Sequence, residues 1–155
     1  MYNNNMNCDI TITLTPYFWD RKPNLLIIVN GKIIENKFDF LESGTPINLK
    51  YNIDLQDVNK LQICLQNKTN DQTVVENKKI VKDQWITLDD IEIDGVVLHP
   101  SMLLKGKFQP FYPKNLLESE NQLPKYVSTT QFNYNGIYEL NFSMPIHVWF
   151  FENLD

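Results

Sequence analysis

The feature that most constrains the fold is a series of short segments in which apolar and polar residues alternate. The three clearest segments are residues 10–15, 47–54 and 61–66, where Ile, Leu or Tyr occupies every second position. Such a period of two places one face of a β-strand in a core and the other face in solvent. Asn30-Gly31 and Asp94-Gly95 are strong hairpin signals, because both turn positions tolerate a positive φ. The pattern predicts short antiparallel strands joined by tight turns.

The composition agrees with a β-rich fold. The 155 residues include no alanine and 15 isoleucines; alanine is the best helix former, and β-branched residues favour strands. At least eight strand candidates, with turns every 8 to 12 residues, predict an all-β antiparallel sandwich of the jelly-roll-like type. We expect one domain over residues 1–155, with the polar segment 1–7 flexible.

Other segments are less regular. Residues 101–125 combine three prolines with several aromatic residues, and we expect them to form a long Pro/aromatic loop. The only helical candidates are residues 54–61 and 115–120. Two further strands are expected at 126–134 and 138–142, around Asn135-Gly136, and the chain is expected to close on a strand at 146–151.

Charge and cysteine usage narrow the function classes. The formal net charge of -5, with scattered lysines, argues against binding to nucleic acid or to an anionic membrane surface. We expect a soluble protein, because the N-terminus has no secretion signal and no apolar run is long enough to span a bilayer. Cys8 and Cys64 lack metal-ligand spacing and are expected to be buried thiols.

Catalytic patterns are missing from the sequence. The two histidines, His99 and His147, have no nucleophile or carboxylate arranged around them, and we expect both to be structural. Asp90, Glu92 and Asp94 would share one face of a strand, as a solvated face does; a pair of catalytic acids is the alternative. We therefore predict that the chain is not an enzyme.

Two kinds of binding site are suggested by residue type. Aromatic rings can serve as flat platforms for sugars, and Trp85 and Tyr112 are our candidates, with Trp19, Tyr134 and Trp149 as further rings. Calcium takes oxygen ligands from loops, and such ligands occur close together here, although turn preference alone also explains them. The candidate ligands are Asn67, Asn70, Asp71, Asn77 and Asp83.

Two longer runs carry a resemblance to known families. The run Leu61–Asn77 is a strand followed by a polar loop, and the run Asp83–Leu98 contains Ile91-Glu-Ile-Asp-Gly95. Together they resemble the hydrogen-bonded loop and I-x-I-D-G pattern of calcium-dependent xylan-binding modules. Residues 60–155 also resemble short β-sandwich virion proteins of tailed phages with low-GC marine hosts. In that likeness, 108–113 is the Pro/aromatic loop and 145–154 the closing segment.

The resemblance to xylan-binding modules implies a calcium ion that bridges sugar hydroxyls, with Asp71 and Asp83 as its ligands. Lys68, Lys78 and Lys79 lie among these residues and would oppose a cation. We therefore keep the fold, discount the metal, and expect no cofactor.

Two functions remain open. The first is a non-catalytic structural or decoration module of a phage virion, associated with the capsid or tail. It would act through contacts with other virion proteins or with its own copies. The aromatic residues expected to form this partner interface are Phe108, Phe111, Trp149 and Phe151. The alternative is a carbohydrate-binding module that recognises a glycan, with or without calcium.

Overall fold

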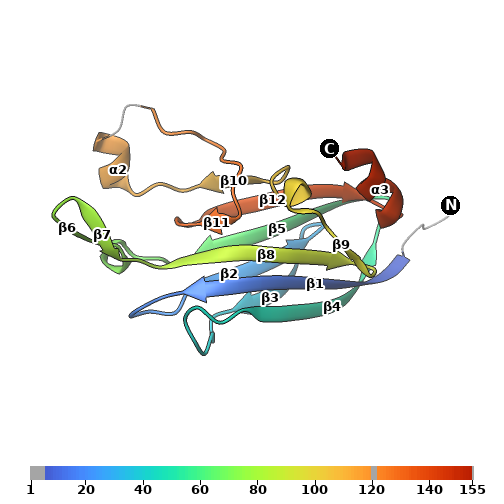
Figure 1. Cartoon of the computed structure of the whole chain (residues 1–155), viewed down its shortest axis with the longest axis horizontal. Helices are drawn as coiled ribbons and strands as arrows, with labels where there is room; N and C mark the ends of the chain where they lie inside the picture. The colour runs from blue at the N-terminus through green and yellow to red at the C-terminus, as the bar shows by residue number, and fades with distance from the viewer. Residues whose placement is uncertain (1–5, 120–121, 155) are drawn as a thin grey trace.

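The computed structural model describes residues 6–119 and 122–154, which form an antiparallel β-sandwich (Figure 1). The strands are β1 (Met6–Tyr17), β2 (Asn24–Val29), β3 (Lys32–Lys37), β4 (Ile47–Leu55), β5 (Val58–Gln66), β6 (Val74–Glu76), β7 (Lys79–Lys82), β8 (Trp85–Ile93), β9 (Val96–Val97), β10 (Lys107–Pro110), β11 (Gln131–Phe132) and β12 (Gly136–Ser143). The helices are the 3-10 turn η1 (Asn70–Gln72), α1 (Pro100–Leu103), α2 (Lys114–Ser119) and α3 (Ile146–Asn153).

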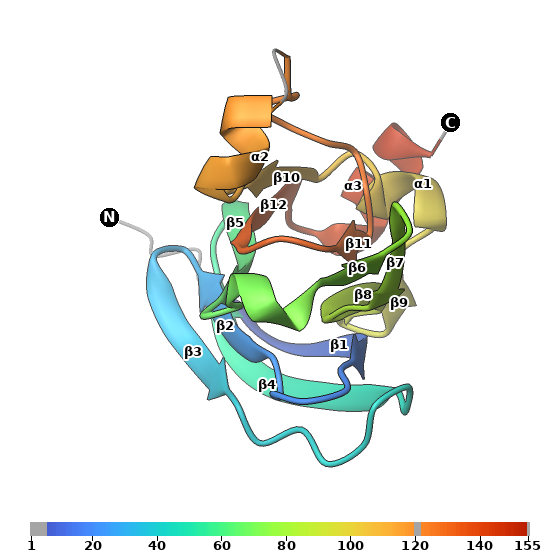
Figure 2. The same ribbon diagram turned by 90° about the vertical axis from the view of Figure 1, so that its left-hand side faces the viewer.

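The strands form two main sheets and a separate hairpin. The first sheet has the order β11-β8-β1-β4, with β9 also paired to β8, and the second has the order β10-β12-β5-β2-β3. The view along the strands in Figure 2 shows these sheets on opposite sides of one interior, with β3 and β4 next to each other where their edges meet. There the Tyr51 hydroxyl donates a hydrogen bond to Glu35 Oε1 across 3.2 Å. The all-β sandwich predicted from the sequence is confirmed.

The core lies between the two sheets and follows the predicted alternation. Ile10, Ile12 and Leu14 of β1 are fully buried, and they face the equally buried Leu61 and Ile63 of β5. Burial of apolar area on this scale is the main favourable term in folding. The described core is one continuous cluster that draws on both sheets.

The two predicted hairpin turns are confirmed. Asn30 and Gly31 have φ values of 50° and 81° between β2 and β3, and Asp94 and Gly95 have 50° and 83° between β8 and β9. A positive φ at both central positions matches the twist of the flanking strands. The Asn135-Gly136 pair behaves differently, because β11 joins the first sheet and β12 joins the second.

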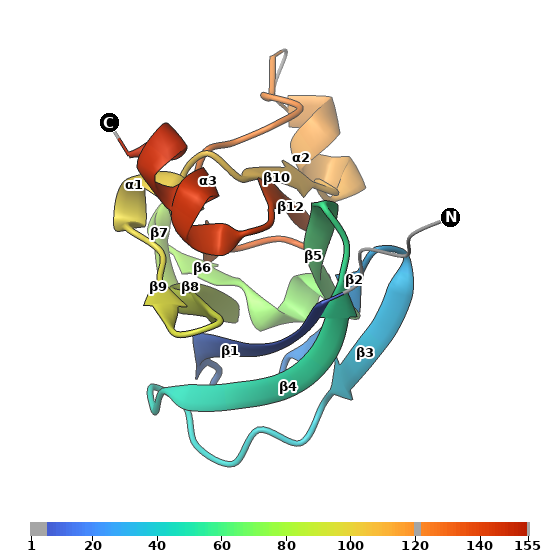
Figure 3. The same ribbon diagram turned by 90° about the vertical axis from the view of Figure 1, so that its right-hand side faces the viewer.

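The C-terminal segment is helical, so the strand predicted for residues 146–151 is wrong. Pro145 occupies the N-cap position of α3, and Ile146 and Trp149, three residues apart, are both buried. Figure 3 shows α3 at the end of the sandwich that is opposite to β6 and β7 in Figure 1. A continuous apolar run fits either period, and the sequence pattern alone therefore could not separate strand from helix.

Four other local expectations also change. Residues 54–61 are not helical, because the Asn59 side chain closes a turn between β4 and β5 with hydrogen bonds to both the N–H and the carbonyl of Gln56. Residues 101–125 are not a continuous loop but contain β10 and α2, whereas the helix expected at 115–120 is present as α2. Of the segment 126–134, only β11 is a strand. Of the segment 1–7, Met6 and Asn7 already belong to β1 and residues 1–5 lie outside the described residues.

Cys8 and Cys64 are free and buried, as expected. Burial raises the pKa of both thiols, with nearby carboxylates adding to the effect at Cys8. None of the described helices is long and apolar enough to cross a membrane.

Candidate functional site

Segments that are distant in sequence meet at one end of the sandwich, on the left in Figure 1. They are the loop that follows β5, the β6–β7 hairpin, the lead-in to β8, the segment from Phe111 into α2, and residues 133–135 between β11 and β12. Loops at one end of a rigid β-scaffold are a common location for binding sites.

Asn135 joins three of these segments. Its Oδ1 accepts a hydrogen bond from the Lys68 backbone N–H, and its Nδ2 donates to the Lys68 carbonyl, both at 2.9 Å. Its own carbonyl accepts from the Phe111 backbone N–H at 2.6 Å. One asparagine therefore fixes the loop after β5 and the start of the Phe111 segment relative to β12.

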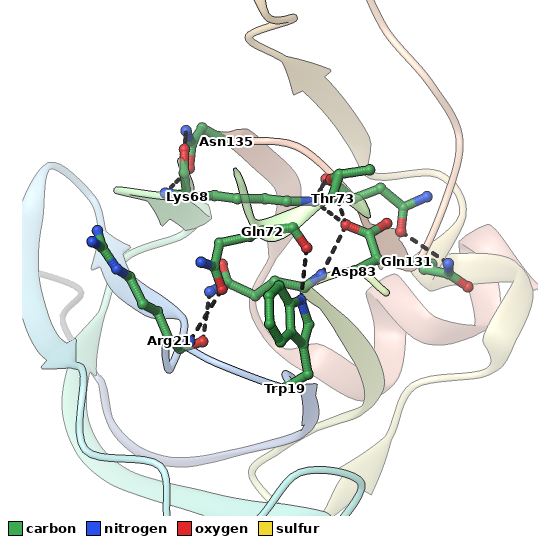
Figure 4. Close-up of polar contacts among 10 residues, drawn as sticks. Trp19, Arg21, Lys68, Gln72, Thr73, Asp83, Gln131 and Asn135 are labelled. Atoms are coloured by element: carbon green, nitrogen blue, oxygen red, sulfur yellow. Dashed lines mark hydrogen bonds and ion pairs between the residues drawn. The ribbon is translucent and has the colours of Figure 1, made fainter. Parts of the chain in front are cut away.

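A buried ion pair lies beside this clamp. The Lys68 ammonium donates to Asp83 Oδ1 at 2.7 Å and to the Asn133 carbonyl at 2.5 Å. Asp83 Oδ1 also accepts from the Thr73 hydroxyl at 2.7 Å and from the Gln84 backbone N–H at 2.8 Å (Figure 4). The side chains of Lys68 and Asp83 are only 8% and 14% exposed, so water screens the pair weakly.

Two buried glutamines attach the loop of residues 19–21 to the same region. The Trp19 indole N–H donates to the Gln72 carbonyl at 2.9 Å, and the Arg21 backbone N–H donates to Gln72 Oε1 at 3.1 Å. Gln84 Nε2 donates to the Arg21 carbonyl at 2.8 Å. These contacts hold η1 and the lead-in to β8 against the loop of residues 19–21, and Figure 4 draws them around the labelled Trp19, Arg21 and Gln72.

A cleft of about 340 Å³ opens above this network. Its size is at the small end of ligand pockets, which span roughly 300–1,000 Å³. Its apolar lining residues are Val75, Ile80, Phe111, Pro113, Leu116 and Tyr134, and its polar ones are Lys68, Thr69, Asn70, Thr73, Asn115 and Asn135. In the described part of the chain, the side-chain amides of Asn70 and Asn115 make no hydrogen bond, and both residues are exposed. The cleft thus combines aromatic rings with available amide donors and acceptors.

Four of the sequence candidates lie at or near this cleft. Phe111 lines it and is 51% exposed. Tyr112 packs edge-on against Tyr134, with ring centroids 5.2 Å apart, and donates its hydroxyl to the Pro124 carbonyl; burial and Tyr134 raise its pKa. Asp83 belongs to the ion pair underneath. Asp71 is exposed and accepts a hydrogen bond from the Thr69 hydroxyl, which lowers the pKa of its carboxyl.

Trp85, the other glycan candidate, is not among the residues that line this cleft. It lies in register with Tyr17 on the first sheet, and the two rings stack with centroids 4.6 Å apart and an interplanar angle of 14°. One face of the indole is therefore covered by Tyr17.

The expected partner-interface residues separate into two groups. Phe108 and Trp149 are 2% and 8% exposed and belong to the core, so their rings offer almost no surface to a partner. Phe108 stacks on Phe132, and Trp149 packs on Phe142. Phe111 and Phe151 are exposed, but they lie at opposite ends of the sandwich.

Some residues of the cleft gave no signal in the sequence. Asn135 looked like part of a hairpin turn, and Val75 and Ile80 looked like ordinary strand residues. Asp83 has the residue type of a metal ligand, and no local pattern indicates its pairing with Lys68, 15 positions earlier. The two histidines are exposed; His99 caps α1 by accepting a hydrogen bond from the Ser101 N–H, which is a structural role.

No protein-family model and no curated protein matches the sequence. Among solved structures, the fold is similar to the selenomethionine form of vCBM60, a protein described as linking two families of calcium-dependent carbohydrate-binding modules through circular permutation. That match has a TM-score of 0.55 at 10% identity and covers 86% of this chain and 89% of that chain. The complex of vCBM60 with galactobiose matches with a TM-score of 0.54 at 10% identity, covering 86% and 98%. At this identity, the likeness establishes a shared β-sandwich fold.

The donor set at the cleft does not fit calcium. Calcium requires about six to eight oxygen ligands, whereas Asp83 Oδ1 already receives the Lys68 ammonium and two further donors. Asp71 turns its carboxylate to Thr69. Within residues 6–119 and 122–154, no cluster of three or more His, Cys, Asp or Glu side chains is arranged to hold a metal.

Proposed function

We propose that this chain is a non-catalytic carbohydrate-binding module whose sugar site is the cleft at the β6–β7 end of the sandwich. The observation that carries the proposal is the lining of the cleft. The exposed ring of Phe111 and the half-buried ring of Tyr134 lie beside the exposed amide side chains of Asn70 and Asn115. Sugar rings have apolar C–H faces and polar hydroxyl edges, so a site for them needs both kinds of surface.

The fold likeness supports the same class of function. One matching structure of vCBM60 contains galactobiose, and galactobiose is therefore a suitable first probe. The small cleft favours a short oligosaccharide or the end of a chain over a long polymer lying across a sheet. The polar lining predicts recognition of hydroxyl groups by amides, with the rings supplying apolar contact.

Affinity electrophoresis in gels that contain soluble polysaccharides tests the proposal. The chain should be retarded by at least one polysaccharide, and Phe111→Ala should abolish the retardation, because an aromatic anchor in a binding site is commonly worth about 2 kcal/mol or more. Phe151→Ala is the matched control, since Phe151 is 73% exposed but lies in α3 at the other end. Tyr134→Phe should also bind, because it keeps the ring.

Unchanged migration of the parent chain in every polysaccharide, with galactobiose also failing to bind in a direct titration, would count against the proposal. So would retardation that survives Phe111→Ala.

The role in a phage virion remains a prediction that none of the similar structures addresses. The sequence argument for it includes Trp149 and Phe151 as interface residues on the strand expected at 146–151. That argument is weaker now, because α3 buries Ile146 and Trp149 and leaves Val148 and Phe151 outside. We therefore rank glycan binding above virion decoration.

A further inference from the structure

The Lys68 ammonium is held by two oxygen atoms from different segments of the chain. Its two hydrogen-bond partners are the Asp83 carboxylate and the Asn133 carbonyl. An ammonium group carries three N–H donors and a full positive charge. Burial of such a charge is costly unless it is paired and hydrogen-bonded, and these two oxygens supply a counter-charge and a second acceptor.

The ammonium also connects separate parts of the chain. Lys68 follows β5 in the second sheet, Asp83 precedes β8 in the first sheet, and Asn133 lies between β11 and β12. Asp83 in turn holds Thr73, just after η1. Lys68 and Thr73 themselves line the cleft, and a bound metal ion would link these segments in the same way, by attracting oxygens from different loops.

We propose that the Lys68 ammonium takes the place of a metal ion at this end of the sandwich. The cleft is therefore ordered by the chain's own cation, and glycan binding there does not require calcium. The statement about glycan binding rests on the proposed function. Ordering of the cleft by Lys68 is independent of the proposed function, because it concerns only the folded chain and no ligand.

An internal cation has a physical consequence that a bound metal does not share. A metal stabilises a protein by mass action, so stability rises with metal concentration and falls on chelation. A covalently attached ammonium has no such dependence. Its removal leaves the Asp83 carboxylate buried without a counter-charge, and breaking a buried pair in this way is strongly destabilising.

Thermal unfolding of the 155-residue chain tests the proposal with calcium as the probe. The Tm of the parent chain should be the same in EDTA and in millimolar calcium. Lys68→Ser should lower the Tm by about 10 °C. Lys79→Ser is the matched control, because it removes the same charge from an exposed position in β7 and should leave the Tm almost unchanged.

A parent Tm that rises with calcium and falls in EDTA would overturn the inference, and this measurement remains decisive even if Lys68→Ser does not fold. A Lys68→Ser chain as stable as Lys79→Ser would overturn it as well. Glycan binding is then measured in both buffers. Binding only in calcium refutes the internal cation but keeps the module, whereas no binding in either buffer, with the expected Tm values, refutes the module but keeps the internal cation.

Discussion

Removal of the Asn135 side chain should loosen the whole cleft, because this one amide holds the loop after β5. Asn135→Ala deletes the hydrogen bond from the Lys68 N–H and the hydrogen bond to the Lys68 carbonyl, both 2.9 Å long and partly buried. Each such bond contributes about 1 kcal/mol, and a partly buried group left unpaired adds to the loss. We expect a decrease of about 2–3 kcal/mol in the free energy of unfolding.

Urea unfolding followed by tryptophan fluorescence measures this change, and for a domain of this size it corresponds to a decrease in Tm of roughly 4–12 °C. Asn133→Ala is the control two positions earlier. Among the described residues, the Asn133 side chain accepts a hydrogen bond from Gln131 Nε2 alone, at an exposed position, while the contact with Lys68 is made by the Asn133 backbone carbonyl. Equal stability of the two variants would refute the role assigned to Asn135.

The ion pair of Lys68 with Asp83, the buried Tyr138 hydroxyl and the close contact at Gly136 each give one further prediction. Lys68→Met should be less stable than the double variant Lys68→Met/Asp83→Asn, because the second change removes the uncompensated charge of Asp83. A double-mutant cycle by urea unfolding measures the coupling between the two residues, and purely additive changes in unfolding free energy would contradict the prediction. Burial raises the pKa of the Tyr138 hydroxyl, so on raising the pH the unfolded chain loses this proton before the folded chain does. The contribution of Tyr138 to stability should therefore be full below pH about 10 and should fall as the pH rises further, and Tyr138→Phe should flatten this dependence in unfolding curves measured from pH 8 to 11. Gly136→Ala should strongly reduce the yield of folded protein, because the added Cβ would lie 2.3 Å from a backbone carbonyl of β10, and a normal Tm would show that this contact relaxes easily.

The sequence predicted those parts of the fold in which one local pattern dominates. Ile10, Ile12 and Leu14 alternate with threonines, and the structure buries them as a period of two requires. The tight turns at Asn30-Gly31 and Asp94-Gly95 are equally local signals. In α3 the local pattern was ambiguous, because a continuous apolar run hides the spacing of Ile146 and Trp149.

The site was harder to predict because it is formed by tertiary contacts. Phe111 and Asp83 were identified from residue type, but the cleft depends on Asn135 meeting Lys68 across 67 positions. Residue type also suggested the wrong chemistry for Asp83, since a carboxylate in a polar loop can bind a metal ion or a lysine equally well. The tertiary structure determines that the Lys68 ammonium is the cation that contacts the Asp83 carboxylate.

The central claim is that the cleft binds a glycan without a metal ion, and a glycan array probed in EDTA tests it most directly. The parent chain and Phe151→Ala should bind the same group of related glycans, and Phe111→Ala should lose them by at least tenfold in apparent affinity. A background-level profile for the parent chain, or glycan binding that appears only when calcium replaces EDTA, would contradict the account.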